Sequence, residues 1–124
     1  MEIEQGQHGE LTMVVGIEDT AIAMGSGSVE VLATPRIVAW VEAASVAALA
    51  GALEGGSTSV GIRIDLAHKA PAPVGAEVTA AATVKEVEGS AITFEVTAFA
   101  AGVELANGEH TRVIVDEARF GSAS

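Results

Sequence analysis

Apolar and polar positions alternate with a period of two over most of the C-terminal half of the chain. Four such segments follow one another, at Thr58–Lys69, Ala76–Glu88, Ser90–Ala101 and Val103–Val115. This period places successive side chains on opposite faces of a strand, and the short connections containing Gly or Pro favour antiparallel pairing. The pattern therefore predicts four consecutive antiparallel strands.

The first of these segments also predicts which residues face the core. Strict alternation places Val60, Ile62, Ile64, Leu66 and His68 together on the apolar face. The alternating residues, Gly61 among them, are assigned to the other face. His68 is therefore predicted to point toward the core at the end of its strand.

The last two segments are predicted to be joined by a turn near Gly102. Asn107-Gly108 is the strongest local hairpin signal in the chain. A turn there would leave residues 103–106 as a stub, so we predict a turn near Gly102 and a β-bulge at Gly108.

The N-terminal half predicts one strand and one long helix. Leu11–Glu18 has the character of a strand, and Gly25–Ser28 that of a loop or lid. A helix is predicted from Thr34, as N-cap with Pro35 at the first helical position, to about Glu54, where two glycines follow. It is apolar almost all round, so we expect protein to enclose most of its faces. A helix packed on a curved antiparallel sheet of five strands is an α+β domain.

Length, charge and cysteine content narrow the functions. The 124 residues suit one domain, 1–124, and the absence of cysteine excludes disulfides and thiolate chemistry. The net charge of −11 disfavours nucleic acid as a partner, and an anionic ligand such as CoA would need a local basic patch. The polar N-terminus gives no export signal, so we expect a cytoplasmic protein. The apolar stretch Ile37–Leu53 has 17 residues, is interrupted by Glu42 and is too short to favour a membrane span.

Three residues stand out as candidates for chemistry. Glu42 is a carboxylate in an apolar helix, either in a functional groove or on a face that reaches solvent or a dimer seam. Glu42→Gln should hold or raise stability, because a buried carboxylate loses more on desolvation than an amide does. His68 is either a satisfied core histidine or a base. Thr34 has a structural explanation as helix cap, yet it also lies where a helix N-terminus can stabilise an oxyanion.

The sequence lacks the motifs of a metal site, a phosphate-binding loop and an α/β-hydrolase. His8 and His110 make no metal-ligand spacing with His68, so we predict no metal and no cofactor. The glycine-rich stretches lack the lysine of a phosphate loop, and no Gly-x-Ser-x-Gly elbow occurs.

The chain resembles the hotdog-fold thioesterases that are similar to fluoroacetyl-CoA thioesterase. The resemblance covers roughly Leu11 to Phe120 and rests on the segments Ala33–Glu42 (ATPRIVAWVE), Val60–Pro71 (VGIRIDLAHKAP) and Gly108–Arg112 (GEHTR). It implies the hotdog fold and hydrolysis of an acyl-CoA with a short or medium acyl group.

The resemblance also implies site residues. Thr34, Glu42 and His68 fall on the family's catalytic positions, and Gly61 and Arg112 match residues that line its site. His68 would be the general base, Glu42 would orient it or hold water, and Thr34 would be either nucleophile or positioner of the oxyanion and water. The fluoroacetyl-specific member has aromatic lid residues where Ala21–Val31 has none, so the resemblance does not extend to fluoroacetyl selectivity.

The sequence also predicts an oligomer and leaves two rival functions open. One sheet around one helix leaves an edge strand uncovered, so we expect a homodimer, or a tetramer built from it, with the site near the seam. A non-catalytic acyl-CoA or acyl-ligand binding protein is the main alternative, because a fold does not fix a function. A hotdog hydratase is a second rival, although no motif of that branch is present.

Overall fold

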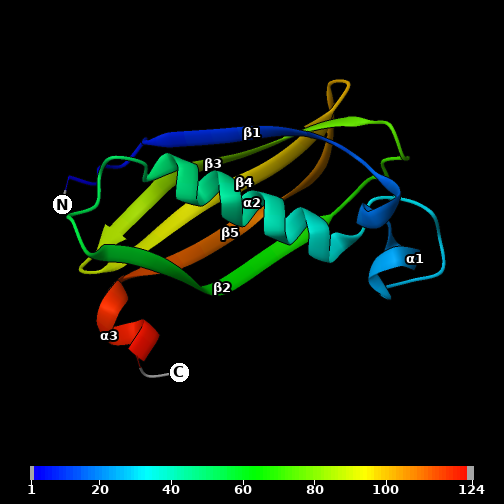
Figure 1. The fold of residues 1–124 in the computed structure, drawn as a ribbon. Helices are drawn as coiled ribbons and strands as arrows, with labels where there is room; N and C mark the ends of the chain where they lie inside the picture. The colour runs from blue at the N-terminus through cyan, green and yellow to red at the C-terminus, as the bar shows by residue number, and fades with distance from the viewer. Residues whose placement is uncertain (1, 123–124) are drawn as a thin grey trace.

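The structure is a computed structural model that describes residues 2–122, and it consists of one antiparallel sheet with one main helix across it (Figure 1). The elements in chain order are β1 (His8–Val14), η1 (Ile17–Asp19), α1 (Ala21–Met24), α2 (Thr34–Ala48), β2 (Ser57–His68), β3 (Glu77–Glu88), β4 (Ala91–Ala100), β5 (Val103–Asp116) and α3 (Glu117–Ser122). The predicted α+β class, with five strands and one long helix, is confirmed.

The sheet has the strand order β1-β3-β4-β5-β2, and every neighbouring pair is antiparallel. The four period-two segments are β2 to β5, in agreement with the prediction. The sheet is not closed, because β1 and β2 lie at opposite edges. The outer edge of β2 therefore keeps backbone groups that no other strand within residues 2–122 pairs.

The core lies between α2 and the sheet. Ile37, Val41 and Ala44 on α2 are fully buried, as are Phe94 and many small residues of β3 to β5. The helix packs closest to β1 and β3 (Figure 1). On its other side, Glu42 of α2 lies against Gly61 of β2, and a pocket of about 310 Å³ opens between the end of α2 and Thr58 and Ser59 of β2. We call this space between α2 and β2 the groove. Within residues 2–122, no helix is long and apolar enough to cross a membrane.

The predicted end of α2 is wrong. The helix ends at Ala48 and not near Glu54, because the chain tightens into i→i+3 bonds such as Leu49 N–H to Val46 O (3.1 Å). Protein encloses most of its faces, and the exposed residues of the helix are Thr34, Pro35, Ala39 and Val46. An apolar strip of α2 thus faces away from the sheet of its own chain.

The first strand lies earlier than predicted. β1 ends at Val14, whose partner Glu77 begins β3, so no strand remains for the next residues to pair with. The chain then turns through η1, where the Asp19 carboxylate accepts a hydrogen bond from the Gly16 N–H at 2.8 Å. This turn directs the chain toward α1 and the start of α2.

The turn near Gly102 is confirmed, but the bulge at Gly108 is not. β4 and β5 are joined at Ala101 and Gly102, and both have positive φ. Gly108 pairs regularly with Leu66 on β2 and with Val96 on β4. A Cβ at Gly108 would lie 1.9 Å from the Asp65 carbonyl oxygen, so the glycine serves the close approach of β2.

A bulge in β2 changes which residues face the helix. Gly61 pairs with Arg112 and Arg63 pairs with Thr111, which leaves Ile62 as the extra residue. The alternation therefore changes phase at Ile62. The predicted face of His68 is correct, but Gly61, assigned to the opposite face, also points toward the helix side.

Candidate active site

Thr34 and His68 form a hydrogen-bonded pair at the N-terminus of α2. Thr34 is the first residue of the helix and His68 the last residue of β2, and Thr34 Oγ1 lies 2.6 Å from His68 Nδ1. Thr34 is exposed, and His68 is half-buried. The two residues are 34 positions apart in the sequence, yet their side chains are in direct contact.

The second ring nitrogen of His68 determines the direction of this hydrogen bond. His68 Nε2 lies 3.1 Å from the Ala70 carbonyl oxygen, which can only accept, so Nε2 carries the proton. Nδ1 is then the acceptor, and the Thr34 hydroxyl donates to it. A hydroxyl that donates to an imidazole held by a third group is the arrangement of an activated nucleophile.

Thr34 does not have the capping role that the sequence predicts. The N-cap is Ala33, one residue earlier, and no side chain caps this helix end. Pro35 is therefore the second helical residue and not the first. Because its hydroxyl is engaged with His68 instead of the helix backbone, the structural explanation for Thr34 as a cap is removed.

Glu42 belongs to a different group of residues. Its Oε2 lies 3.5 Å from Arg112 Nη1 and 3.7 Å from His110 Nε2, and its side chain is 40% exposed. Among the described residues, Glu42 makes no hydrogen bond or ion pair with Thr34 or His68. Eight helix residues separate Thr34 from Glu42, a rise of about 12 Å, so within one chain the two groups lie at different points along the groove.

Arg112 is the centre of the second group. It is buried, and its Nε donates to Ser59 Oγ at 2.8 Å while Nη2 donates to Ser59 O at 3.0 Å. Burial lowers the pKa of Arg112 and the nearby Glu42 opposes that effect, although a guanidinium stays charged at neutral pH. Because its neighbours hold this buried guanidinium in place, it also fixes the position of the Glu42 carboxylate that faces it.

His110 completes this group, and sequence reasoning gave it no role. It is 1% exposed, its Nδ1 lies 2.8 Å from the Arg63 carbonyl oxygen, and its Nε2 lies 3.1 Å from Arg112 Nη1. Burial lowers the pKa of His110, although the bond to Arg63 O partly opposes this shift. The neutral ring carries its proton on Nδ1, so the approach to Glu42 at 3.7 Å is not an ion pair. Its spacing of two from Arg112 on one strand is the signal that was available.

Gly61 allows the Glu42 carboxylate to lie against the strand. A Cβ at this position would lie 2.5 Å from Glu42 Oε2 and 2.9 Å from His110 Cε1. Real Cβ atoms do not approach so closely, so any larger residue would displace the carboxylate. The predicted site residues Gly61 and Arg112 are therefore both found beside Glu42.

Two cations flank the Thr34–His68 pair. Arg36 lies two residues after Thr34 and pairs with Asp19 at 2.8 Å, and Lys69 follows His68 and pairs with Glu104 at 3.2 Å. A pocket of about 230 Å³ opens here, lined by Val31, His68, Lys69, Ala70 and Pro71. This is the part of the groove mouth where an anionic ligand would meet positive charge.

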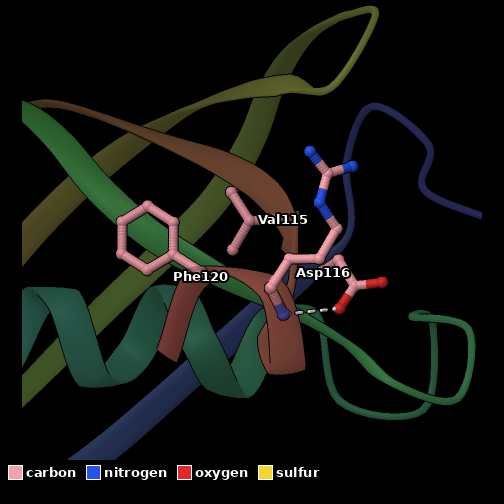
Figure 2. Close-up of a pocket in the computed structure, with 4 residues that line it drawn as sticks. Val115, Asp116 and Phe120 are labelled. Carbon is pink, nitrogen blue, oxygen red and sulfur yellow. Dashed lines mark hydrogen bonds between the residues drawn. The ribbon is translucent and has the colours of Figure 1, made fainter. Parts of the chain in front are cut away.

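A larger cleft, of about 340 Å³, lies at the other end of β2. It is lined by Val115, Asp116, Arg119 and Phe120, and Asp116 accepts a hydrogen bond from the Arg119 N–H (Figure 2). None of the predicted site residues lines it. Within residues 2–122, no group of three or more histidine or acidic side chains is arranged to hold a metal ion.

Comparisons with known proteins agree with this fold. The model of the fluoroacetyl-CoA-specific thioesterase family, FlK, matches residues 15–118. The fluoroacetyl-CoA thioesterase of Streptantibioticus cattleyicolor is 36% identical over 91 residues, which are 73% of this chain and 66% of that protein. The chain thus spans just under two thirds of that relative's length.

Solved structures give the same result. A structure of fluoroacetyl-CoA thioesterase superposes with a TM-score of 0.92 at 29% identity, covering 99% of this chain and 96% of the other. A Thermus thermophilus protein described as a thioesterase superfamily member gives 0.91 at 25% identity, with 98% and 90% covered. A hot-dog-like protein from Thermanaerovibrio acidaminovorans gives 0.87 at 26% identity, with 96% and 88% covered. The fold is the hotdog fold, and the chain belongs to the fluoroacetyl-CoA-specific thioesterase family.

Proposed function

We propose that this protein hydrolyses the thioester of a short or medium acyl-CoA, with Thr34 as nucleophile and His68 as general base. The observation that carries the proposal is the 2.6 Å contact from Thr34 Oγ1 to an unprotonated His68 Nδ1. A threonine hydroxyl is a weak nucleophile unless a base lies within hydrogen-bond reach, and here one does. This geometry supports the nucleophile role over that of a water positioner.

In the first half-reaction, Thr34 Oγ1 attacks the thioester carbonyl carbon while His68 takes the hydroxyl proton. The new C–O bond replaces the C–S bond, and the departing sulfur receives the proton from His68. Pro35 has no N–H, and the N–H groups of Arg36 and Ile37 donate to Ala33 O. The oxyanion is therefore stabilised by the N–H of Thr34 and by the positive end of the α2 dipole.

In the second half-reaction, water adds to the acyl carbon and loses a proton to His68. The ester C–O bond then breaks, Thr34 recovers its proton from His68, and the free acid leaves. Glu42 is a charged, half-exposed group farther along the groove, and we assign it the role of ordering water and ligand there. Gly61 and Arg112 support this role because they set its position.

The proposed substrate class rests on the cations near the Thr34–His68 pair and on the composition of the segment Ala21–Val31. Structures of fluoroacetyl-CoA thioesterase variants contain acetyl-CoA, or fluoroacetate with CoA. In this chain, Lys69 and Arg36 beside the reactive pair are suited to the CoA phosphates, in exchange for Glu104 and Asp19. The segment Ala21–Val31 has no aromatic side chain to restrict the acyl end. We therefore favour a range of short and medium acyl groups over fluoroacetyl alone.

The functional unit in this proposal is a homodimer. The outer edge of β2 is unpaired, Ile62 on it is 61% exposed, and Val46 on the free side of α2 is 50% exposed. Pairing of β2 with β2 of a second copy would satisfy the edge and cover both apolar residues. Sedimentation equilibrium at micromolar concentration should show a dimer, whereas a stable folded monomer would contradict this part of the proposal.

The test of activity is a screen of acyl-CoAs from two to about ten carbons for release of free thiol, with Thr34→Ala as the matched control. Hydrolysis by the wild type that the variant lacks would support the proposal. Binding of acyl-CoA without steady-state turnover would instead show a non-catalytic binding protein.

A further inference from the structure

We propose that His110 is a positioning residue that keeps the Glu42 carboxylate available in the groove by holding Arg112 away from it. This inference rests on the proposed thioesterase function and assigns a role to a buried histidine that the mechanism above does not use.

The first step is the protonation state of His110. The Arg63 carbonyl oxygen, 2.8 Å from Nδ1, can only accept a hydrogen bond, so Nδ1 must carry the proton. The ring is buried to 1% exposure and stacks on Phe94, with centroids 6.3 Å apart and planes at 25°. Its Nε2 is thus an unprotonated acceptor in a fixed position.

The second step is what this acceptor binds. Arg112 Nη1 donates to His110 Nε2 at 3.1 Å and reaches Glu42 Oε2 only at 3.5 Å. Charged Arg–carboxylate pairs free to choose their geometry close to about 2.8 Å and often engage both oxygens. Arg112 is prevented from doing so, because Nε and Nη2 are held by Ser59 and one Nη1 proton by His110.

The third step is the consequence for Glu42. Arg112 contacts the carboxylate only at 3.5 Å, and 40% of the Glu42 side chain remains exposed to the groove. Without the acceptor at Nε2, Ser59 still holds Nε and Nη2, but Nη1 is free to close on Glu42 Oε2 and form a tighter ion pair with it. That pair would withdraw the carboxylate from any water or ligand in the groove, so the loss should appear in turnover more than in substrate binding.

Two amide variants separate the two hydrogen bonds of the ring. The shorter side chain in His110→Asn can place its amide near the former Nδ1 and bond Arg63 O, but it leaves no acceptor at Nε2. The longer side chain in His110→Gln can place an oxygen near the former Nε2 and accept from Arg112. Both replace the ring by a buried amide, so they serve as matched controls for lost packing against Phe94.

On an acyl-CoA that the wild type hydrolyses, His110→Asn should lose about 10- to 100-fold in kcat, with KM within about threefold of wild type. His110→Gln should recover most of that loss. Equal kcat for the two variants, or a wild-type kcat in His110→Asn, would overturn the proposal, since a purely structural histidine would not distinguish them.

A second measurement does not depend on activity or on the folding of a variant. Long-range ¹H–¹⁵N NMR spectra of the wild-type protein report which imidazole nitrogen of His110 is protonated. The proposal requires the proton on Nδ1 at neutral pH, and a proton on Nε2 would overturn it. If no acyl-CoA is hydrolysed but the proton is on Nδ1, the proposed function fails while the geometry around His110 stands.

Discussion

The Thr34–His68 pair and the Glu42–Arg112–His110 cluster differ in how they are held. The pair is open to solvent and depends on one side-chain hydrogen bond and one backbone carbonyl. The cluster is largely buried, and Ser59, Arg63 O and Gly61 support it from three positions on one strand. In the proposed function, the exposed pair supplies the reactive groups, and the buried cluster sets the position of the Glu42 carboxylate.

The largest effect should come from breaking the exposed pair. Thr34→Ala or His68→Ala should lower turnover by about 10²–10⁴-fold, because nucleophile and base act as one unit. Stability should change little, since both residues lie at the surface end of their elements. Steady-state kinetics and thermal melts measure the two quantities, and unchanged turnover in folded His68→Ala would return His68 to a structural role.

A smaller effect on turnover, but a larger one on stability, is expected for Glu42→Gln. The sequence alone predicts that stability holds or rises, because a buried charge is removed. The structure reverses this sign, because Arg112 would remain buried without its carboxylate at a cost of about 1–2 kcal/mol. We expect kcat to fall at least tenfold and the urea midpoint to decrease. Wild-type kcat would refute the role assigned to Glu42.

Gly61→Ala tests whether the position of the Glu42 carboxylate matters, without removing its charge. The new Cβ must displace the Glu42 carboxylate, so we expect about a tenfold loss of kcat with the Thr34–His68 contact intact. Gly55→Ala is the matched control, because a Cβ there meets nothing within 4 Å. Equal activity of the two variants would show that the close approach at Gly61 has no functional consequence.

The smallest effect concerns pH and only the buried cluster. The pKa of His110 is lowered by burial, so between its folded value and the ordinary value of 6.5 the unfolded chain binds a proton that the native protein does not. Stability should therefore fall as pH decreases below about 6.5, by at most about 1.4 kcal/mol per pH unit. Urea unfolding of His110→Gln should show a weaker dependence over pH 7 to 5. An identical slope would mean that His110 is not the group responsible.

The sequence predicted the fold because its signals are regular. Period-two alternation and glycine-containing turns locate β2 to β5. Asn107-Gly108 is the stronger local turn signal, but the turn forms at Gly102 because a turn at Asn107-Gly108 would leave too short a strand before it. The end of α2 was not predictable, since residues after Ala48 keep an apolar, helix-forming composition while the backbone tightens. Local composition does not encode that change.

The sequence names candidate site residues, but it does not say which of them lie together. The resemblance named Thr34, His68, Glu42, Gly61 and Arg112, and the structure divides them between two places. Strict alternation put Gly61 on the wrong face, because a bulge has no signature in an apolar sequence. His110 was missed because a single histidine in a strand is ordinarily a core residue.

The extra residue in β2 marks a point where the strand can change its length by one residue without turning the candidate site away from α2. Ser59 and Gly61 lie before Ile62, and His68 lies after it, yet all three must face α2. Deleting Ile62 would make Gly61 and Arg63 consecutive residues that pair with Arg112 and Thr111 in a regular ladder, and the strand residues on both sides would keep the faces they have now. Ile62 is therefore the position in β2 at which the chain can lose one residue while Ser59, Gly61 and His68 all still face α2.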